Sequence, residues 1–255
     1  MSRYLDFKLG NKKLSDFGGV IMNDGECTEN YLPSLNLKSQ SLVNSDGELF
    51  YGSKLDPKII DEKIAIIDIS KFNGDEFKAW INCREQQWFN YVGDNKKIKV
   101  VRNNSLNSSL YSDGEIMELS FIAHKPYWQP IDDKIWTQNT PSVNIVYKFN
   151  INSNTDSLPL IKLECIGNKV DTKFEINGLQ FNIKNMTTEI YIDCEHEAVY
   201  TLVNDEKLTR LSEFECVSLN KFKYTFPKLN IGENYFKLLK GSLSRVIINT
   251  NERYL

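Results

Sequence analysis

The stretch FPKLNIGENYFKLLKGSLSRVIINTNERYL, residues 226–255, alternates short apolar runs with residues that are typical of turns. Pro227 fixes φ and ends a strand. Gly232 and the asparagines on either side of it favour a tight turn, because glycine takes positive φ freely and asparagine tolerates it. The apolar runs that follow predict two strands joined at Gly241. The chain is therefore predicted to end in strands that return to a sheet.

The segments before this stretch repeat the same pattern of apolar runs and turn residues. INGLQFNI, residues 176–183, contains Asn177-Gly178, a strong two-residue signal for a β-hairpin. The apolar runs recur at roughly 8–12 residues, a spacing that is typical of an antiparallel β-sandwich. The second half of the chain is therefore predicted to be such a sandwich.

The first half is also predicted to consist mostly of strands. LVNSDGELFYGS, residues 42–53, places Ser45-Asp46-Gly47 between two apolar stretches, which predicts a hairpin. IAIIDIS, residues 64–70, is short and rich in β-branched residues, so it is predicted to be a buried strand.

One segment of the first half has a helical period instead. In NGDEFKAWINCREQQWF, residues 73–89, four large apolar residues lie at offsets that share one face of a helix. The polar and acidic residues at its start suit a helix N-terminus. We predict one amphipathic helix near 75–88, with its core residues being Phe77, Trp80, Ile81 and Trp88.

The composition changes in KPYWQPIDDKIWTQNTPS, residues 125–142, where three prolines occur close together. Proline removes donors from a strand ladder, so this density suggests a crossing between domains. We therefore predict an N-terminal domain at 1–138 and a C-terminal domain at 139–255. Tyr127 and Trp128 in this segment are the best candidates for exposed aromatic rings.

Size and charge restrict the class of protein. The 255 residues carry 31 basic and 34 acidic side chains, a net charge of −3. Nothing in this balance favours nucleic acid or an anionic membrane as a partner. The apolar runs are too short to span a bilayer, and the N-terminus has no apolar segment of a secretory signal. The five cysteines are scattered, without a C-x-x-C motif, so all five are predicted to be thiols.

No motif predicts catalysis, a cofactor or a metal site. Neither of the two histidines, His124 and His196, lies in a sequence context that recommends a catalytic triad. IDCEHE, residues 192–197, contains three types of metal ligand, and on a strand Cys194 and His196 would share one face. The simpler interpretation is a strand that ends in a solvated turn, with Cys194 as a small buried apolar residue. We predict that the protein is not an enzyme.

The order of these pieces resembles the distal tail protein (Dit) family of tailed bacteriophages, over nearly the whole chain. In the first half the matching pieces are FGGVIMNDG, then DEFKAWINCREQQW, then MELSFIAHKPYW with its proline–aromatic exit. In the second half they are FEINGLQFNI, TTEIYIDCEHEAVY, FPKLNIGENYFKLLKG and SRVIINTNERYL. The segment 204–225 looks longer than is usual in that family.

The resemblance implies a mainly β fold, with an N-terminal β-sandwich-like domain that carries one helix and a C-terminal galectin-like β-sandwich. It also implies a hexameric ring built by the N-terminal domains, which joins the tail tube protein to the hub or tip protein or to a baseplate. The C-terminal domains of such a ring can dock receptor-binding or other baseplate proteins. The location implied is the tail of a virion or of a phage-tail-like particle made in the cytoplasm of a bacterial host.

Two other classes of function remain open from the sequence. The first is a carbohydrate-binding β-sandwich that acts alone, with Tyr127 and Trp128 as its aromatic platform. The second is a β-rich glycosidase, whose two carboxylates would pair only in space.

Overall fold

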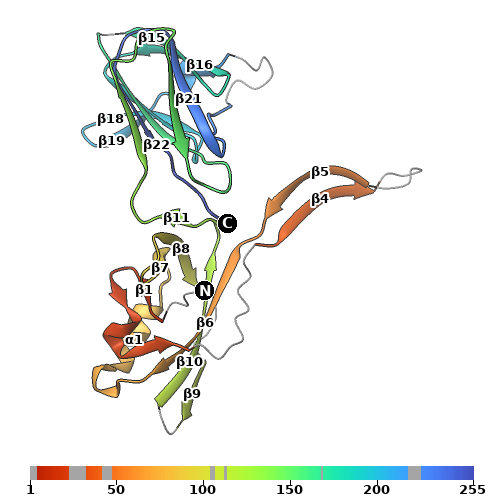
Figure 1. Cartoon of the computed structure of the whole chain (residues 1–255), viewed down its shortest axis with the longest axis vertical. Helices are drawn as coiled ribbons and strands as arrows, with labels where there is room; N and C mark the ends of the chain where they lie inside the picture. Colours follow the sequence, from red (N-terminus) through yellow and green to blue (C-terminus); the bar gives the residue numbers. More distant parts are fainter. Residues whose placement is uncertain are drawn as a thin grey trace. The chain divides into compact units, whose positions relative to one another are not determined.

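The chain divides into two compact units, Met1–Ile131 and Asp132–Tyr254. The computed structural model describes residues 5–22, 33–41, 48–103, 107–111, 114–167, 169–217 and 225–255. Strands dominate the described residues, and the α-helix among them lies in the first unit (Figure 1). The predicted fold class, mainly β with a sandwich in the second half, is confirmed.

The first unit is built on one antiparallel sheet with the strand order β2-β1-β7-β8-β10-β6-β3, with β11 paired to β8 and β9 paired to β10. Side chains alternate between its two faces. In β6, for example, Ile60, Ile64 and Ile66 are buried, whereas Asp61 and Lys63 are exposed. The strands are β1 (Phe7–Leu9), β2 (Lys12–Lys13), β3 (Gly19–Ile21), β6 (Lys58–Ile66), β7 (Gln87–Tyr91), β8 (Lys96–Arg102), β9 (Asn107–Tyr111), β10 (Gly114–Ala123) and β11 (Gln129–Pro130).

Strands β1, β7 and β10 of this sheet contribute to one aromatic core. The ring of Phe7 on β1 lies 5.1 Å from that of Phe89 on β7 and 6.0 Å from that of Phe121 on β10. Two short 3₁₀ helices, η1 (Leu14–Phe17) and η2 (Ile69–Lys71), belong to the same unit, and η1 adds the buried Leu14 and Phe17 to the core.

Helix α1 (Gly74–Ile81) packs on this core. The side chain of Asn73 caps it, because its Oδ1 accepts hydrogen bonds from the backbone N–H groups of Asp75 and Glu76, each at 3.2 Å. Phe77 and Ile81 are buried. Acidic residues in the first turn also suit the positive end of the helix dipole.

The predicted extension of the helix to residue 88 is wrong. The helix ends at Ile81, and Trp88 lies on strand β7. The positions that would continue the apolar stripe after Ile81 are Arg84 and Glu85, so the stripe has no further member until Trp88. The offset of eleven residues that placed Trp88 on the helix is therefore a coincidence of spacing.

Strands β4 (Leu35–Ser41) and β5 (Glu48–Leu55) form a separate two-stranded sheet, which we call the ribbon (Figure 1). They pair antiparallel from Leu35↔Leu55 to Ser41↔Glu48. This pairing is the one predicted for the segment, although the Ser45-Asp46-Gly47 turn itself falls outside the described residues.

The second unit is an antiparallel β-sandwich. One sheet has the order β12-β22-β14-β17-β18-β19 and the other has the order β13-β21-β15-β16-β20. The first consists of β12 (Ile135–Asn139), β14 (Leu160–Cys165), β17 (Glu189–Asp193), β18 (Ala198–Val203), β19 (Glu206–Thr209) and β22 (Leu243–Asn249). The second consists of β13 (Val146–Ile151), β15 (Val170–Ile176), β16 (Leu179–Met186), β20 (Phe214–Cys216) and β21 (Gly232–Lys240), and η3 (Leu211–Glu213) precedes β20.

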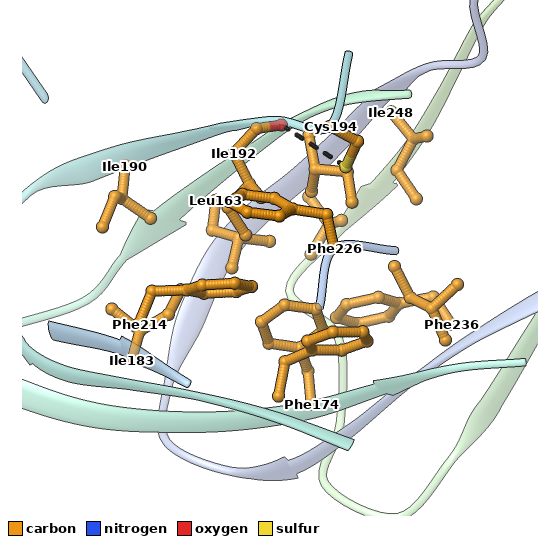
Figure 2. Close-up of a cluster of buried hydrophobic side chains, with 14 of the residues drawn as sticks. Leu163, Phe174, Ile183, Ile190, Ile192, Cys194, Phe214, Phe226, Phe236 and Ile248 are labelled. Atoms are coloured by element: carbon orange, nitrogen blue, oxygen red, sulfur yellow. Dashed lines mark hydrogen bonds between the residues drawn. The ribbon is translucent and has the colours of Figure 1, made fainter. Parts of the chain in front are cut away.

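A single apolar core fills the space between these two sheets (Figure 2). The six-stranded sheet contributes aliphatic side chains, among them Leu163, Ile190, Ile192 and Ile248. The five-stranded sheet contributes aromatic rings together with aliphatic side chains, and the rings include Phe174, Phe181, Phe214 and Phe236. Each sheet thus covers the apolar face of the other.

Strand β12 belongs to the second unit, so the division between the units lies before this strand. Its five residues pair with β22 from Ile135↔Asn249 to Asn139↔Arg245, and the ring of Trp136 stacks on Phe149 at 4.8 Å. The predicted boundary between residues 138 and 139 would cut this strand. The division follows Ile131, which lies within the proline-rich segment 125–142 that suggested it.

The Asn177-Gly178 hairpin is confirmed. Ile176 at the end of β15 pairs with Leu179 at the start of β16, and both turn residues have positive φ, 49° and 84°. Two consecutive residues with positive φ give the turn that matches the twist of paired strands.

The closing stretch of the chain forms a turn and two strands, as predicted, but the strands enter different sheets. Gly232 has φ 85° and Gly241 has φ 107°. β21 joins the five-stranded sheet and β22 joins the six-stranded sheet, so Gly241 lies where the chain crosses from one layer to the other. Asn234 contributes through its side chain rather than through its backbone conformation.

Asn234 is fully buried, and its side-chain amide is completely hydrogen-bonded. Its Oδ1 accepts from the backbone N–H of Asn230 at 2.8 Å and from Nδ2 of Asn177 at 2.7 Å. Its Nδ2 donates to the carbonyls of Asn230 and Gly232 at 2.8 and 2.9 Å. The amide therefore holds the loop before β21 against the turn of the β15–β16 hairpin.

Candidate functional site

The IDCEHE segment is a turn at the end of β17. Cys194 is buried in the sandwich core, with its Sγ 4.0 Å from the carbonyl oxygen of Ile192 (Figure 2). The side chain of His196 is 65% exposed, and its Nδ1 lies 2.9 Å from Oδ2 of Asp193. Cys194 and His196 therefore do not share a face, and the interpretation of a solvated turn with a buried cysteine is confirmed.

The structure gives no further support for a metal site or for reactive thiols. Within the described ranges, no group of three or more His, Cys, Asp and Glu side chains could hold a metal ion. Burial, and to a smaller extent the charge of Asp193, raises the pKa of the Cys194 thiol well above its usual value. Cys83, Cys165, Cys194 and Cys216 are free thiols, and Cys27 lies outside the described residues.

The proposed aromatic platform at Tyr127 and Trp128 is not an exposed one. Both side chains are half-buried. The ring of Trp128 stacks on Tyr91 at 5.9 Å, and Nζ of Lys58 lies 5.8 Å from its centroid. The prediction of exposure is therefore wrong for Trp128, which packs at the edge of the core of the first unit.

Trp80 and Trp88 have opposite environments. Trp80 is half-buried on α1, and its Nε1 donates a hydrogen bond to the carbonyl of Leu9 at 2.9 Å. Its ring stacks on Phe17 at 4.9 Å and on Phe7 at 5.7 Å. Trp88 lies on the face of β7 that points away from the core, because its neighbour Phe89 is fully buried.

The ribbon carries apolar side chains that nothing in its own sheet covers. Leu35 and Leu37 are 55% and 60% exposed. They lie two residues apart on one face of β4, and Leu35 is directly opposite the half-buried Leu55 on β5. Asn36 and Lys38 lie on the other face. A two-stranded sheet is at best marginally stable alone, so this face is suited to burial against a partner.

The helix α1 has eight residues, and no described helix is long and apolar enough to cross a membrane.

Comparison with known proteins gives a likeness at the level of fold. No protein-family model and no curated protein matches the sequence. Among solved structures, the Dit protein of phage SPP1 matches over 100% of both chains, with a TM-score of 0.72 and 10% sequence identity. The chain has the fold of SPP1 Dit. That protein is described as a paradigm of the hub adsorption apparatus in phages that infect Gram-positive bacteria.

A second match is more distant. A chain of the phage P2 baseplate, in its conformation activated with Ca, has a TM-score of 0.47 and 10% identity over 97% of each chain. This likeness is too low to support an argument. At the level of fold, the match to SPP1 Dit confirms the resemblance stated from the sequence, and it includes both units in their order along the chain.

Proposed function

We propose that this protein is a structural adaptor of a phage tail or of a phage-tail-like particle. The observation that carries the proposal is the match to SPP1 Dit over the full length of both chains. A match of that extent includes the helix-bearing unit, the sandwich and their order, which a shared sandwich alone would not provide. A protein of this kind acts by holding other proteins in place rather than by catalysis.

In this proposal the first unit forms a hexameric ring, and the ribbon supplies a contact between neighbouring copies. A ring is built from heterologous interfaces, in which one surface of each copy covers a different surface of the next. The ribbon suits such an interface, because Leu35 and Leu37 are exposed together on one face of a sheet that no other described strand covers. Burial of a leucine side chain contributes about 1.5–3 kcal/mol.

The ring would join the tail tube protein on one side to the hub, tip or baseplate on the other. The second unit has its own closed core, so it can project from the ring and dock receptor-binding or other baseplate proteins. The protein would be made in the cytoplasm of the bacterial host and would act in the tail of the particle.

Negative-stain imaging of the purified protein tests this proposal, alone at high concentration and mixed with the hub protein of the same particle. The expected result is rings with six-fold symmetry in at least one of these samples. Monomers in both samples, and in the assembled particle, would contradict the adaptor function. The carbohydrate-binding alternative depended on exposed rings at Tyr127 and Trp128, and the stacking of the half-buried Trp128 on Tyr91 favours the adaptor over it.

A further inference from the structure

The first unit has a basic surface on the face of its sheet that points away from the core. Phe7 and Leu9 of β1 are buried, so Lys8 between them points to the opposite face. Lys13 of β2 is directly opposite Lys8, and Lys99 of β8 is directly opposite Trp88 of β7. We call this surface the basic face, and its residues are Lys8, Lys13, Trp88, Lys97 and Lys99.

Two lysines of the basic face, Lys97 and Lys99, converge on the tryptophan ring. The Nζ atoms of Lys97 and Lys99 lie 4.7 and 4.9 Å from the centroid of Trp88. Trp88 is half-buried by these neighbours, although it stands outside the core. Both ammonium groups therefore lie near one ring, and their like charges repel each other.

No lysine of the basic face forms an ion pair within the part of the chain that the structure describes, and Nζ of Lys97 donates a hydrogen bond to the carbonyl of Ile131 at 2.7 Å. Of the ion pairs between described side chains, none includes Lys8, Lys13, Lys97 or Lys99. Lys12, on the other face of the sheet, pairs with Glu76, and Lys148 and Lys162 of the second unit also pair with glutamates. These four lysines thus have no carboxylate partner, although the chain has more acidic than basic side chains.

We propose that the basic face docks an acidic segment of a partner polypeptide. Carboxylates of such a segment would relieve the repulsion between the lysines, and Trp88 would provide apolar contact at the centre of the interface. Nucleic acid fits less well, because the two ammonium groups already occupy the surroundings of the ring on which a base would stack. The net charge of −3 also disfavours a long polyanion. The proposal does not depend on the hexameric ring.

Binding of a fluorescently labelled poly-L-glutamate peptide to the full-length protein tests this proposal by fluorescence anisotropy. Saturable binding that weakens as salt rises is expected. Lys8→Glu/Lys99→Glu should weaken it by about tenfold or more, because rim charges control association. Lys184→Glu/Lys240→Glu, with the same change in net charge on exposed lysines of the second unit, should leave it unchanged. If the charge-reversal variant does not fold, Lys8→Gln/Lys99→Gln replaces it and should also weaken binding of the peptide.

Three results would overturn the proposal. The first is the absence of saturable binding to the unaltered protein. The second is an equal loss of affinity in the control variant, which would indicate unspecific attraction. The third is tighter binding of a short DNA duplex with the same number of negative charges, which would assign the basic face to nucleic acid.

Discussion

The sandwich of the second unit and the ribbon of the first unit differ in how far their apolar side chains are buried. In the sandwich, the inward rings of the five-stranded sheet, such as Phe174 and Phe236, are covered by the aliphatic side chains of the six-stranded sheet. In the ribbon, Leu35 and Leu37 have no second layer within the described chain and are more than half exposed. The sandwich thus covers its own apolar side chains, whereas the ribbon leaves Leu35 and Leu37 accessible to a partner.

The largest effect is expected from a change in the core of the first unit that leaves the sandwich intact. Trp80→Asp removes the stacking on Phe17 and the hydrogen bond to Leu9, and it places a carboxylate there. Truncation of such a ring typically costs about 3–5 kcal/mol, and a buried charge adds to that cost. The first unit should unfold in a thermal melt while the transition of the second unit is unchanged.

Lys78→Asp is the matched control for this variant. Lys78 is exposed on the same helix, so the change should alter the free energy of unfolding by less than about 0.5 kcal/mol. A fragment that begins at Asp132 should fold alone, because it retains Trp136 on Phe149. If the melt of Trp80→Asp matched that of the unaltered protein, the packing of α1 described above would be wrong.

The next largest effect is expected in the sandwich, at its one fully buried asparagine amide in the described chain. Asn234→Ala leaves the N–H and carbonyl of Asn230 and the carbonyl of Gly232 without their partner. We expect a loss of about 3 kcal/mol, since each unsatisfied buried group costs about 1–3 kcal/mol. Urea unfolding measures it. Asn150→Ala, at an exposed asparagine of β13, is the control and should lower the free energy of unfolding by less than about 0.5 kcal/mol. Equal losses of stability in the two variants would refute the role of the buried amide.

A smaller effect is expected where the chain crosses between the two layers. A Cβ on Gly241 would lie 2.9 Å from Oγ1 and 3.1 Å from Cα of Thr172, at φ 107°. Gly241→Ala should therefore destabilise the second unit by about 2 kcal/mol, through backbone strain and this contact together. Gly232→Ala has a similar φ with nothing within 4 Å, so it should cost only the strain, about 1 kcal/mol. Identical melting temperatures for the two variants would show that the contact with Thr172 is unimportant.

The smallest effect concerns pH and Cys194. The raised pKa keeps this thiol protonated in the folded state, whereas in the unfolded chain it ionises near pH 8.5. Its contribution to stability is complete below about pH 8.5 and is lost as pH rises toward the folded pKa. Ionisation of this thiol in the unfolded chain should lower the free energy of unfolding by about 1.4 kcal/mol between pH 7.5 and 9.5. Urea unfolding of Cys194→Val should show a smaller decline over that range, and an equal decline would assign the pH dependence to other groups.

Local turn chemistry and periodicity were sufficient to predict much of the fold. Asn177-Gly178 predicted a hairpin because few other residue pairs take positive φ twice in succession. The stripe of Phe77 and Ile81 predicted a helix face, and both are buried. These features depend on neighbours in sequence, so one sequence contains the information for them.

The errors arose where the answer depends on distant parts of the chain. Trp88 fits the helical period by chance, and only its pairing with β8 places it on a strand that faces away from the core. Trp128 was predicted to be exposed because it lies among prolines, but Tyr91 from another strand covers its ring. The basic face was missed because its lysines come from three strands and meet only in the sheet.

The mass of the protein in solution, measured by multi-angle light scattering over a range of concentrations, tests the central claim most directly. The unaltered protein should form a species of about six chains, alone or with the hub protein. Leu35→Asp/Leu37→Asp should abolish it without altering the melt of either unit, whereas Asn36→Asp/Lys38→Asp, on the other face of the same strand, should retain it. Retention of the ring by the leucine variant would contradict the role of the ribbon, and a strict monomer under every condition would contradict the adaptor itself.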